Sequence, residues 1–262
     1  MKLRAMTLAV LALSVTSSYA EKVTPEIKKS ALVAATQYLE TQNLPVPDGG
    51  INIVSRNSFK MSKEMMALED KQINQLKTNG TVNEYSEKAQ FLINFPNIVE
   101  EHYKKYAGNN DDRSTHMRNF LGFIKFAFTF PTVNDNDVET LYGYAPGGSF
   151  VTESESPSNK EGWTEGAEYF KNDSAGVCVL MVNPIKVTHA STNVAKESIN
   201  YAVNNKVTIL YSHGNASSGY LYSVKWFDET YFRELDCATP NFDRVTMVKV
   251  VEIAKGIDNF KA

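Results

Sequence analysis

The sequence predicts an α+β fold, in which an N-terminal helical part is packed with or beside a C-terminal, mainly antiparallel β-sheet that ends in a closing helix. In the first half, apolar residues recur three and four positions apart, as on one face of a helix. From Gly176 onward, short runs rich in Val, Ile and Tyr are typical of strands. The boundaries predict a signal peptide (1–20), a helical region (21–132), a loop-rich connection (133–175) and an α+β region (176–262).

The first twenty residues have the pattern of a cleavable export signal. Lys2 and Arg4 precede an apolar run at 5–15, which is too short for a bilayer core that needs roughly 20 residues. Small side chains at Ser18 and Ala20 predict cleavage before Glu21. We therefore expect a soluble mature chain in the periplasm or the secreted fraction, with no membrane span after cleavage.

The helical elements follow in order, and each has a boundary signal. Thr24-Pro25 predicts the start of a helix that runs to about Thr41, and Asn79-Gly80 predicts the end of another. The expected helices span residues 24–41, 61–77, 83–107 with an interruption at Pro96, and 114–129, and residues 51–54 form a short strand. Because these helices carry apolar stripes, we expect them to pack as a small bundle.

The β-rich part begins with an uninterrupted apolar run at 177–182. Residues 206–211 and 220–227 flank a polar stretch and predict a hairpin with a long loop. We expect further strands at 185–189 and, at the edge of the sheet, at 231–237. Thr239-Pro240 is a second cap-and-proline signal, and it predicts a closing helix that stops at Gly256.

The two cysteines predict one structural disulfide. Cys178 and Cys237 form an even pair in a chain that we expect to be exported, and such pairs are usually oxidised. Their spacing matches neither a redox CxxC motif nor a zinc cluster. If residues 177–182 are a central strand and residues 231–237 lie near it, the two sulfur atoms meet. Two buried free thiols are the alternative.

Charge argues against nucleic acid as a partner. The whole chain has a formal net charge of -3, and loss of Lys2 and Arg4 leaves 25 basic against 30 acidic residues, or -5. A mildly acidic chain lacks the long-range attraction that DNA, RNA or anionic lipid requires. We therefore expect an unknown protein partner or a small ligand.

A run at 210–216, which ends an apolar strand, contains Ser212, His213, Gly214 and Asn215. It resembles the strand-end His-Gly-Asn segment of α/β-hydrolases, which implies backbone amides that help to form an oxyanion hole. That fold also needs a later Gly-x-Ser-x-Gly nucleophile elbow, and this sequence has none. His213, Ser212 and His189 remain candidate catalytic residues, because both histidines end predicted strands.

The sequence predicts neither a metal site nor a cofactor. The four histidines, at 102, 116, 189 and 213, show no i, i+4 or i, i+2 spacing. The stretch that begins at Asn134 has Glu139 and Ala145 at the sixth and twelfth positions, where a calcium loop needs Gly and an acid. Turn chemistry explains this stretch and the similar one at 109–112.

Candidate binding residues lie in the aromatic and glycine-rich segment 142–170. Tyr142, Tyr144 and Trp163 alternate there with glycines, and exposed aromatic rings of this kind often make a partner surface. They are also suited to anchoring a long loop to the core. The sequence favours a non-catalytic binding or assembly protein. An unfamiliar hydrolase that uses His213, and a small-ligand carrier lined by residues 120–130, are the alternatives.

Overall fold

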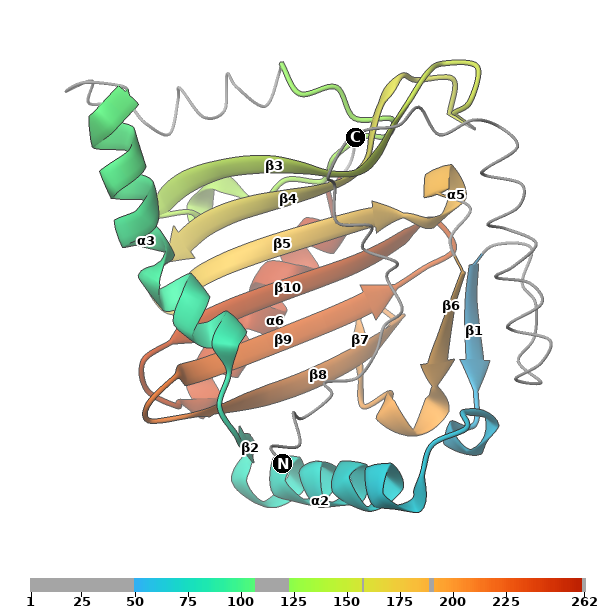
Figure 1. The fold of residues 1–262 in the computed structure, drawn as a ribbon, viewed down its shortest axis with the longest axis vertical. Helices are drawn as coiled ribbons and strands as arrows, with labels where there is room; N and C mark the ends of the chain where they lie inside the picture. Colours follow the sequence, from blue (N-terminus) through green and yellow to red (C-terminus); the bar gives the residue numbers. More distant parts are fainter. Residues whose placement is uncertain (1–49, 107–122, 157, 189–190, 261–262) are drawn as a thin grey trace, which may run out of the picture.

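A computed structural model describes residues 50–106, 123–156, 158–188 and 191–260. The fold is α+β, as predicted: two helices precede and pack on a mainly antiparallel eight-stranded sheet, and a third helix closes the chain (Figure 1). Seven of the strands lie in the order β2-β8-β9-β10-β5-β4-β3, and β7 pairs with β8. A separate pair, β1 and β6, is parallel.

The elements have the following bounds. The strands are β1 (Gly50–Val54), β2 (Val82–Asn83), β3 (Thr140–Val151), β4 (Gly162–Asn172), β5 (Gly176–Pro184), β6 (Ser191–Ala195), β7 (Tyr201–Val203), β8 (Lys206–Asn215), β9 (Gly219–Phe227) and β10 (Tyr231–Thr239). The α-helices are α2 (Lys63–Asn79), α3 (Glu87–Tyr106), α5 (Ile185–Thr188) and α6 (Arg244–Asp258).

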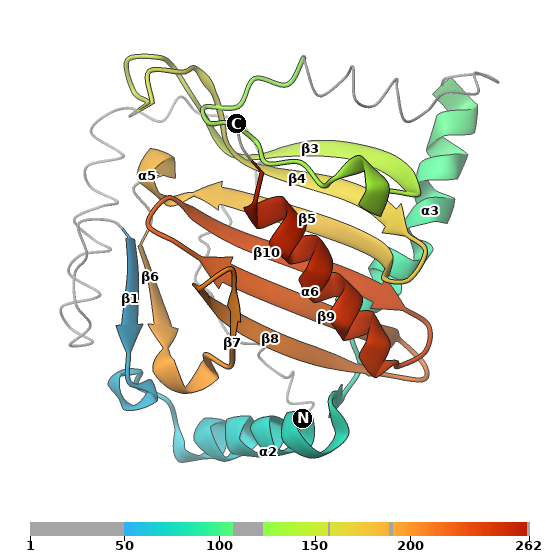
Figure 2. The same ribbon diagram turned by 180° about the vertical axis from the view of Figure 1, so that it is seen from behind.

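The sheet has a helix on each face. Helix α3 crosses one face and α6 crosses the other, as the two opposite views show (Figure 1 and Figure 2). Leu92 of α3 belongs to an apolar cluster with Val179 and Leu221, whereas Val250 of α6 belongs to a larger cluster with Leu180 and Trp226. Alternate residues of the central strands therefore supply two different cores, which is why these strands are apolar on both sides.

The central strands carry the predicted disulfide. Cys178 of β5 lies directly opposite Cys237 of β10, with a Cα–Cα distance of 4.0 Å, and both side chains are buried. The disulfide prediction is confirmed. The expectation that residues 231–237 form an edge strand is wrong, because β10 pairs with β9 on one side and with β5 on the other.

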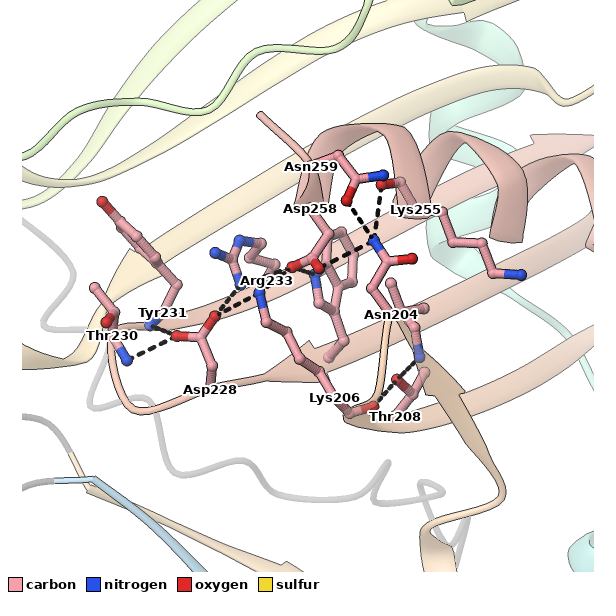
Figure 3. A network of polar contacts seen from close by, with 12 residues as sticks. Asn204, Lys206, Thr208, Asp228, Thr230, Tyr231, Arg233, Lys255, Asp258 and Asn259 are labelled. Carbon is pink, nitrogen blue, oxygen red and sulfur yellow. Dashed lines mark hydrogen bonds and ion pairs between the residues drawn. The ribbon is translucent and has the colours of Figure 1, made fainter. Parts of the chain in front are cut away.

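A polar network fixes the C-terminal end of α6 to the sheet (Figure 3). Lys206 Nζ lies 2.6 Å from Asp258 Oδ1, which also accepts a hydrogen bond of 3.1 Å from Trp226 Nε1. Asn204, in the β7–β8 turn, donates to the Lys255 carbonyl at 3.1 Å. Asn204 has φ 45°, a left-handed conformation that asparagine tolerates, and this tight turn places its amide at the helix end.

The predicted helix at 114–129 is wrong where the structure describes it. Residues 123–129 contain turns and bends around an isolated β-bridge of Phe126 with Trp163, and Ala127 N–H donates to the Trp163 carbonyl at 3.0 Å. Phe126, Phe128 and Phe130 form one aromatic cluster, with ring centroids 5.1–6.0 Å apart. Their i, i+2 spacing is the period of a strand, which brings all three rings to one side. A helix would have separated them.

Other expectations also need correction. Residues 185–188 form one helical turn, α5, in which the Thr188 hydroxyl donates back to the Pro184 carbonyl at 3.1 Å. The segment 133–175 contains β3 and β4, two long strands of the sheet. Met65 and Leu68 are 47% and 48% exposed instead of facing a core. Among the described helices there is no bundle, since α3 packs on β5, β9 and β10.

Several predictions were made for residues outside the described ranges. They include the signal peptide at 1–20, the mature start at Glu21 and the helix at 24–41. The strand at 51–54, the hairpin of β8 and β9 and the closing helix are confirmed. The closing helix is capped by Asp243, whose carboxylate accepts from Val245 N–H at 2.9 Å, instead of by Thr239.

Candidate functional site

The structure places His213 in a chain of hydrogen bonds. His213 lies on β8, which pairs in parallel with β2 and so meets the residues that follow β2. Its Nδ1 atom is 2.7 Å from Glu84 Oε1, and its Nε2 atom is 3.1 Å from Ser86 Oγ. With the proton on Nδ1, the ring donates to Glu84 and accepts from the Ser86 hydroxyl. These three residues have the order of contacts of a serine–histidine–acid triad.

Ser86 also has a structural role, because it caps α3. Ala89 N–H donates to Ser86 Oγ at 3.1 Å, the usual contact of an N-cap serine. Ser86 N–H in turn donates to Ser218 Oγ, in the β8–β9 turn, at 3.1 Å. The residue is only 2% exposed. The serine therefore fixes the start of α3 against the sheet, and a reagent would reach its oxygen only if this end of α3 opened.

The acid of this chain is held in its charged form. The hydrogen bond from His213 lowers the pKa of Glu84, against the opposing effect of partial burial. Gln72 of α2 donates a second hydrogen bond to Glu84 at 3.2 Å. A carboxylate that stays ionised accepts the hydrogen bond from Nδ1 and so orients the imidazole ring, in catalysis as well as in a structural contact.

A cluster of buried charges lies next to this chain, under the N-terminal half of α3. Lys88 of α3 contacts the carboxylate of Asp236, and its Nζ atom is 3.3 Å from Glu234 Oε1. Lys225 of β9 lies 3.1 Å from Glu234 Oε2 and 5.4 Å from the centre of the Tyr211 ring. Two lysines and two carboxylates thus join α3 to β9 and β10; Asp236 is fully buried, whereas the Lys88 side chain is 38% exposed.

The pKa values of these two carboxylates are shifted in opposite directions. Asp236 is fully buried, and burial together with the neighbouring Glu234 raises its pKa to about 7. Burial also acts to raise the pKa of Glu234, but Lys225 and Lys88 outweigh it and lower the value to about 2. Burial raises the pKa of Tyr211 as well. At neutral pH, Glu234 therefore carries the fixed charge and Asp236 is the group able to exchange a proton.

The other predicted catalytic residues do not join this cluster. Ser212 precedes His213 on the strand, so its side chain points to the opposite face of the sheet. It is 1% exposed, and its hydroxyl donates to Thr81 Oγ1 at 3.3 Å. His189 lies outside the described residues. The structure thus brings together His213, Glu84 and Ser86, and the neighbouring Ser212 takes no part.

Two of the three predicted binding residues are buried, and the third is partly exposed. Tyr142 and Tyr144 are 8% and 9% exposed and belong to the two cores. Tyr142 packs edge-on against Phe95 of α3, with ring centroids 5.8 Å apart. Trp163 lies partly exposed near the start of β4, where its ring meets Phe150, itself 49% exposed, at 5.7 Å. These two tyrosines pin the segment to the core, and Trp163 with Phe150 stays accessible.

The outer face of α3 carries two half-exposed apolar side chains among polar residues. Leu92 and Phe95 face the sheet, whereas Phe91 and Ile98 are 46% and 43% exposed. An open groove of about 540 Å³ runs along this face. Its lining includes Glu87, Gln90, Asn94 and Asn97 in addition to the two apolar residues. Half-exposed large apolar side chains beside a groove are typical of a contact surface.

Sequence reasoning missed most of these groups for identifiable reasons. Glu84 and Ser86 are nearly 130 positions from His213, and only the two-residue strand β2 brings them together. Glu234 and Asp236 did give a signal, because two acids spaced i, i+2 in a strand point to the same face. Within the described ranges, no group of three or more potential ligand residues is arranged to hold a metal ion.

None of the described helices is both long and apolar enough to cross a membrane. No protein family model matches the chain, and neither curated proteins nor solved structures include a match to it.

Proposed function

We propose that this chain is an exported, non-catalytic binding or assembly protein of the cell envelope or the secreted fraction. The observation that carries the proposal is the exposed apolar pair Phe91 and Ile98, which lies beside a groove on the outer face of α3. The disulfide of Cys178 and Cys237 supports an oxidising compartment.

Helix α3 offers an exposed aromatic ring on a well-packed helix, which α6 does not. Val245 and Val248 on α6 are 67% and 59% exposed, but they are small and aliphatic. Phe91 supplies an aromatic ring, the kind of side chain that contributes most to protein interfaces. The helix beneath it is firmly held, because Phe95 stacks on Tyr169 with centroids 4.6 Å apart. A rigid platform loses little entropy when it binds.

Site-specific photo-crosslinking in the native host tests the proposal. A photoreactive phenylalanine analogue placed at Phe91 or Ile98 is expected to form a covalent adduct with a protein, and the same analogue at Val245 is the matched control. Adducts at the two α3 positions but not at the control support the proposal. If the α3 positions give no adduct, or no more than the control, the proposal is wrong.

The hydrogen-bonded chain of Ser86, His213 and Glu84 favours an exported hydrolase as the second candidate function. In that reaction Ser86 Oγ attacks an acyl carbonyl and His213 Nε2 takes its proton. A fluorophosphonate probe tests this role, since it labels activated serines. Labelling of Ser86 in the native protein that is lost in His213→Ala supports the hydrolase, and a protein that remains unlabelled excludes it.

The carrier alternative depended on residues 120–130 lining a cavity. Within the described part of that segment, Phe128 and Phe130 are each 7% exposed and pack into the larger core with Tyr144. This packing gives the carrier hypothesis no support.

A further inference from the structure

Polar and charged side chains attach the start of α3 to the sheet. Ser86 Oγ lies 3.1 Å from His213 Nε2 on β8. Lys88 lies 3.3 Å from Glu234 and also contacts the buried carboxylate of Asp236, both on β10. Several of these groups gain or lose a proton, so the attachment of the helix start depends on their charges.

Pro96 interrupts the hydrogen-bond ladder of α3 shortly after these contacts. In an α-helix each N–H donates to the carbonyl four residues earlier, as Gln90 N–H does to Ser86 at 3.1 Å. Pro96 has no N–H, so the Leu92 carbonyl receives no bond of this kind. The bonds to the carbonyls of residues 86–91 therefore form a unit that can break by itself. From Leu92 onward, apolar side chains hold the helix on the sheet.

We propose that residues 86–91 are a pH-sensitive lid, which opens more readily when Asp236 is ionised and then separates Ser86 from His213 and uncovers both. The proposal goes beyond the binding function and does not rest on it, because it concerns how the helix is attached and not what the helix binds. Its basis is the position of Asp236 on β10, which α3 crosses on this face of the sheet (Figure 1).

The Asp236 carboxylate is poorly compensated while the lid is closed. It is fully buried, and apart from its contact with Lys88, neither of its oxygens accepts a hydrogen bond from a described residue. Glu234, two positions away on the same face of β10, adds a like charge. Lys225 of β9 lies 3.1 Å from Glu234 and so compensates that residue first. Burial of a charge with one partner is unfavourable unless water can reach it.

The other strands on this face do little to offset the charge. Val179 of β5 lies directly opposite Asp236 and is apolar. Burial raises the pKa of Tyr211 on β8 and of Tyr169 on β4, so both phenols stay uncharged near neutral pH. His213, beside Tyr211, has its Nδ1 atom 2.7 Å from a carboxylate of the β2–α3 linker.

Opening of the lid favours the charged form of Asp236, because it lets water reach the carboxylate. With the lid closed, burial and the charge of Glu234 raise the pKa of Asp236 to about 7, whereas an aspartate in water has a pKa of about 3.9. Between these values the open form has released a proton that the closed form keeps. The open population therefore rises up to about tenfold per pH unit and becomes constant above pH 7, where both forms are ionised.

Hydrogen–deuterium exchange of the purified mature chain between pH 5 and pH 8, with each rate divided by the intrinsic rate at that pH, tests the lid. The amides of residues 90–95, which donate to the lid carbonyls, are expected to lose protection about 100-fold between pH 5 and pH 7 and no more above it. The amides of α6 should keep their protection. Asp236→Asn should remove the pH dependence, and Asp228→Asn, an equal change away from the lid, should retain it.

Two results overturn the proposal. Protection of residues 90–95 that stays constant with pH after the correction means that the lid does not respond to Asp236. An equal loss of protection in α6 means that water reaches Asp236 only when the whole fold opens, so that there is no separate lid. Both comparisons use the wild type, and they remain decisive even if Asp236→Asn fails to fold.

Discussion

Replacing Asp236 by Asn should remove a specific pH dependence of stability. Asp236 lies fully buried near Lys88 of α3 and Glu234 of its own strand, with Lys225 on the neighbouring strand β9 and Tyr211 on β8 beyond it. Its pKa is raised from 3.8 to about 7 in the folded chain. Between these two values the folded chain keeps a proton that the unfolded chain has released. Folding is therefore favoured at low pH, and this contribution is lost as the pH rises through 7.

The magnitude follows from the size of the shift. Each pH unit inside this window costs about 1.4 kcal/mol, so between pH 5 and pH 8 the contribution of Asp236 to the free energy of unfolding falls by about 2–3 kcal/mol. Glu234 contributes almost no change in the free energy of unfolding between pH 5 and pH 8. Its pKa is lowered to about 2, so its contribution is present above 4.5 and is lost only as the pH falls toward 2.

Urea titrations of wild type and Asp236→Asn at several pH values between 5 and 8 measure the effect. The buried Trp226 provides the fluorescence signal, and non-reducing buffer keeps the disulfide intact. The difference between the two proteins cancels every group that they share, including the histidines. Asp228→Asn is the matched control, because the pKa of Asp228 is lowered to about 2 and its difference from wild type should be constant. An equally constant difference for Asp236→Asn would refute the reasoning.

Three further changes test other parts of the structure. Replacing Cys178 and Cys237 together by Ala releases a loop of 59 residues and should lower the free energy of unfolding by about 4 kcal/mol; an unchanged urea midpoint without reductant would contradict this. Ser86→Ala removes the N-cap of α3 and should cost about 1 kcal/mol in thermal unfolding, whereas Ser86→Asn should retain most of it. Asp258→Asn removes the carboxylate that Lys206 and Trp226 share but leaves Lys206 its second partner, Asp228 at 3.1 Å, so it should cost about 2 kcal/mol, and a loss below about 1 kcal/mol would show that the pair is weak.

The disulfide and most of the strands were predictable because their signals are local. The apolar run of β5 and the alternation in β8 and β9 determine which residues face inward, and the predicted export signal gives the redox expectation. Once β5 and β10 are neighbours, Cys178 and Cys237 need only the correct register to meet.

The segments whose secondary structure was predicted wrongly have local sequence patterns that indicate more than one structure. The segment 123–130 is as apolar as a core helix, but its phenylalanines alternate at i, i+2, and in the structure it is non-helical, with a single bridge between Phe126 and Trp163. β3 contains Gly143, Pro146, Gly147 and Gly148 and has two register shifts against β4, so its sequence resembles a loop. Pro146 is tolerated there because β3 is the edge strand of the sheet.

The contact of His213 with Glu84 and Ser86 was beyond sequence reasoning for a different reason. It depends on one short parallel pairing between β2 and β8, whose two residues give no periodicity to detect. Glu84 and Ser86 lie in a linker whose direction is set by the packing of α2 and α3, and packing is a property of the whole fold. A capping serine before a helix was a readable signal, but its partner across the sheet was not.

The rotation of α3 about its own axis determines both which charges lie against the sheet and which apolar side chains are exposed. A helix packed on a sheet through apolar contacts alone is able to rotate about its axis by a fraction of a turn at little cost, because such contacts are not directional. Lys88 removes this freedom, since only one rotation of α3 lets it reach both Glu234 and Asp236. Phe91, one turn further along, is then fixed on the outer face.

Such a buried ion pair adds little net stability, because removing the charges from water costs about as much as their attraction returns. Its value lies in selecting one orientation of the helix. If this reasoning holds, Lys88→Met should lower the free energy of unfolding less at pH 5, where Asp236 is protonated and only Glu234 loses a partner, than at pH 8, and should weaken every contact made through Phe91. A variant that loses stability at pH 5 but keeps those contacts would show that the cluster supports the fold and does not orient α3.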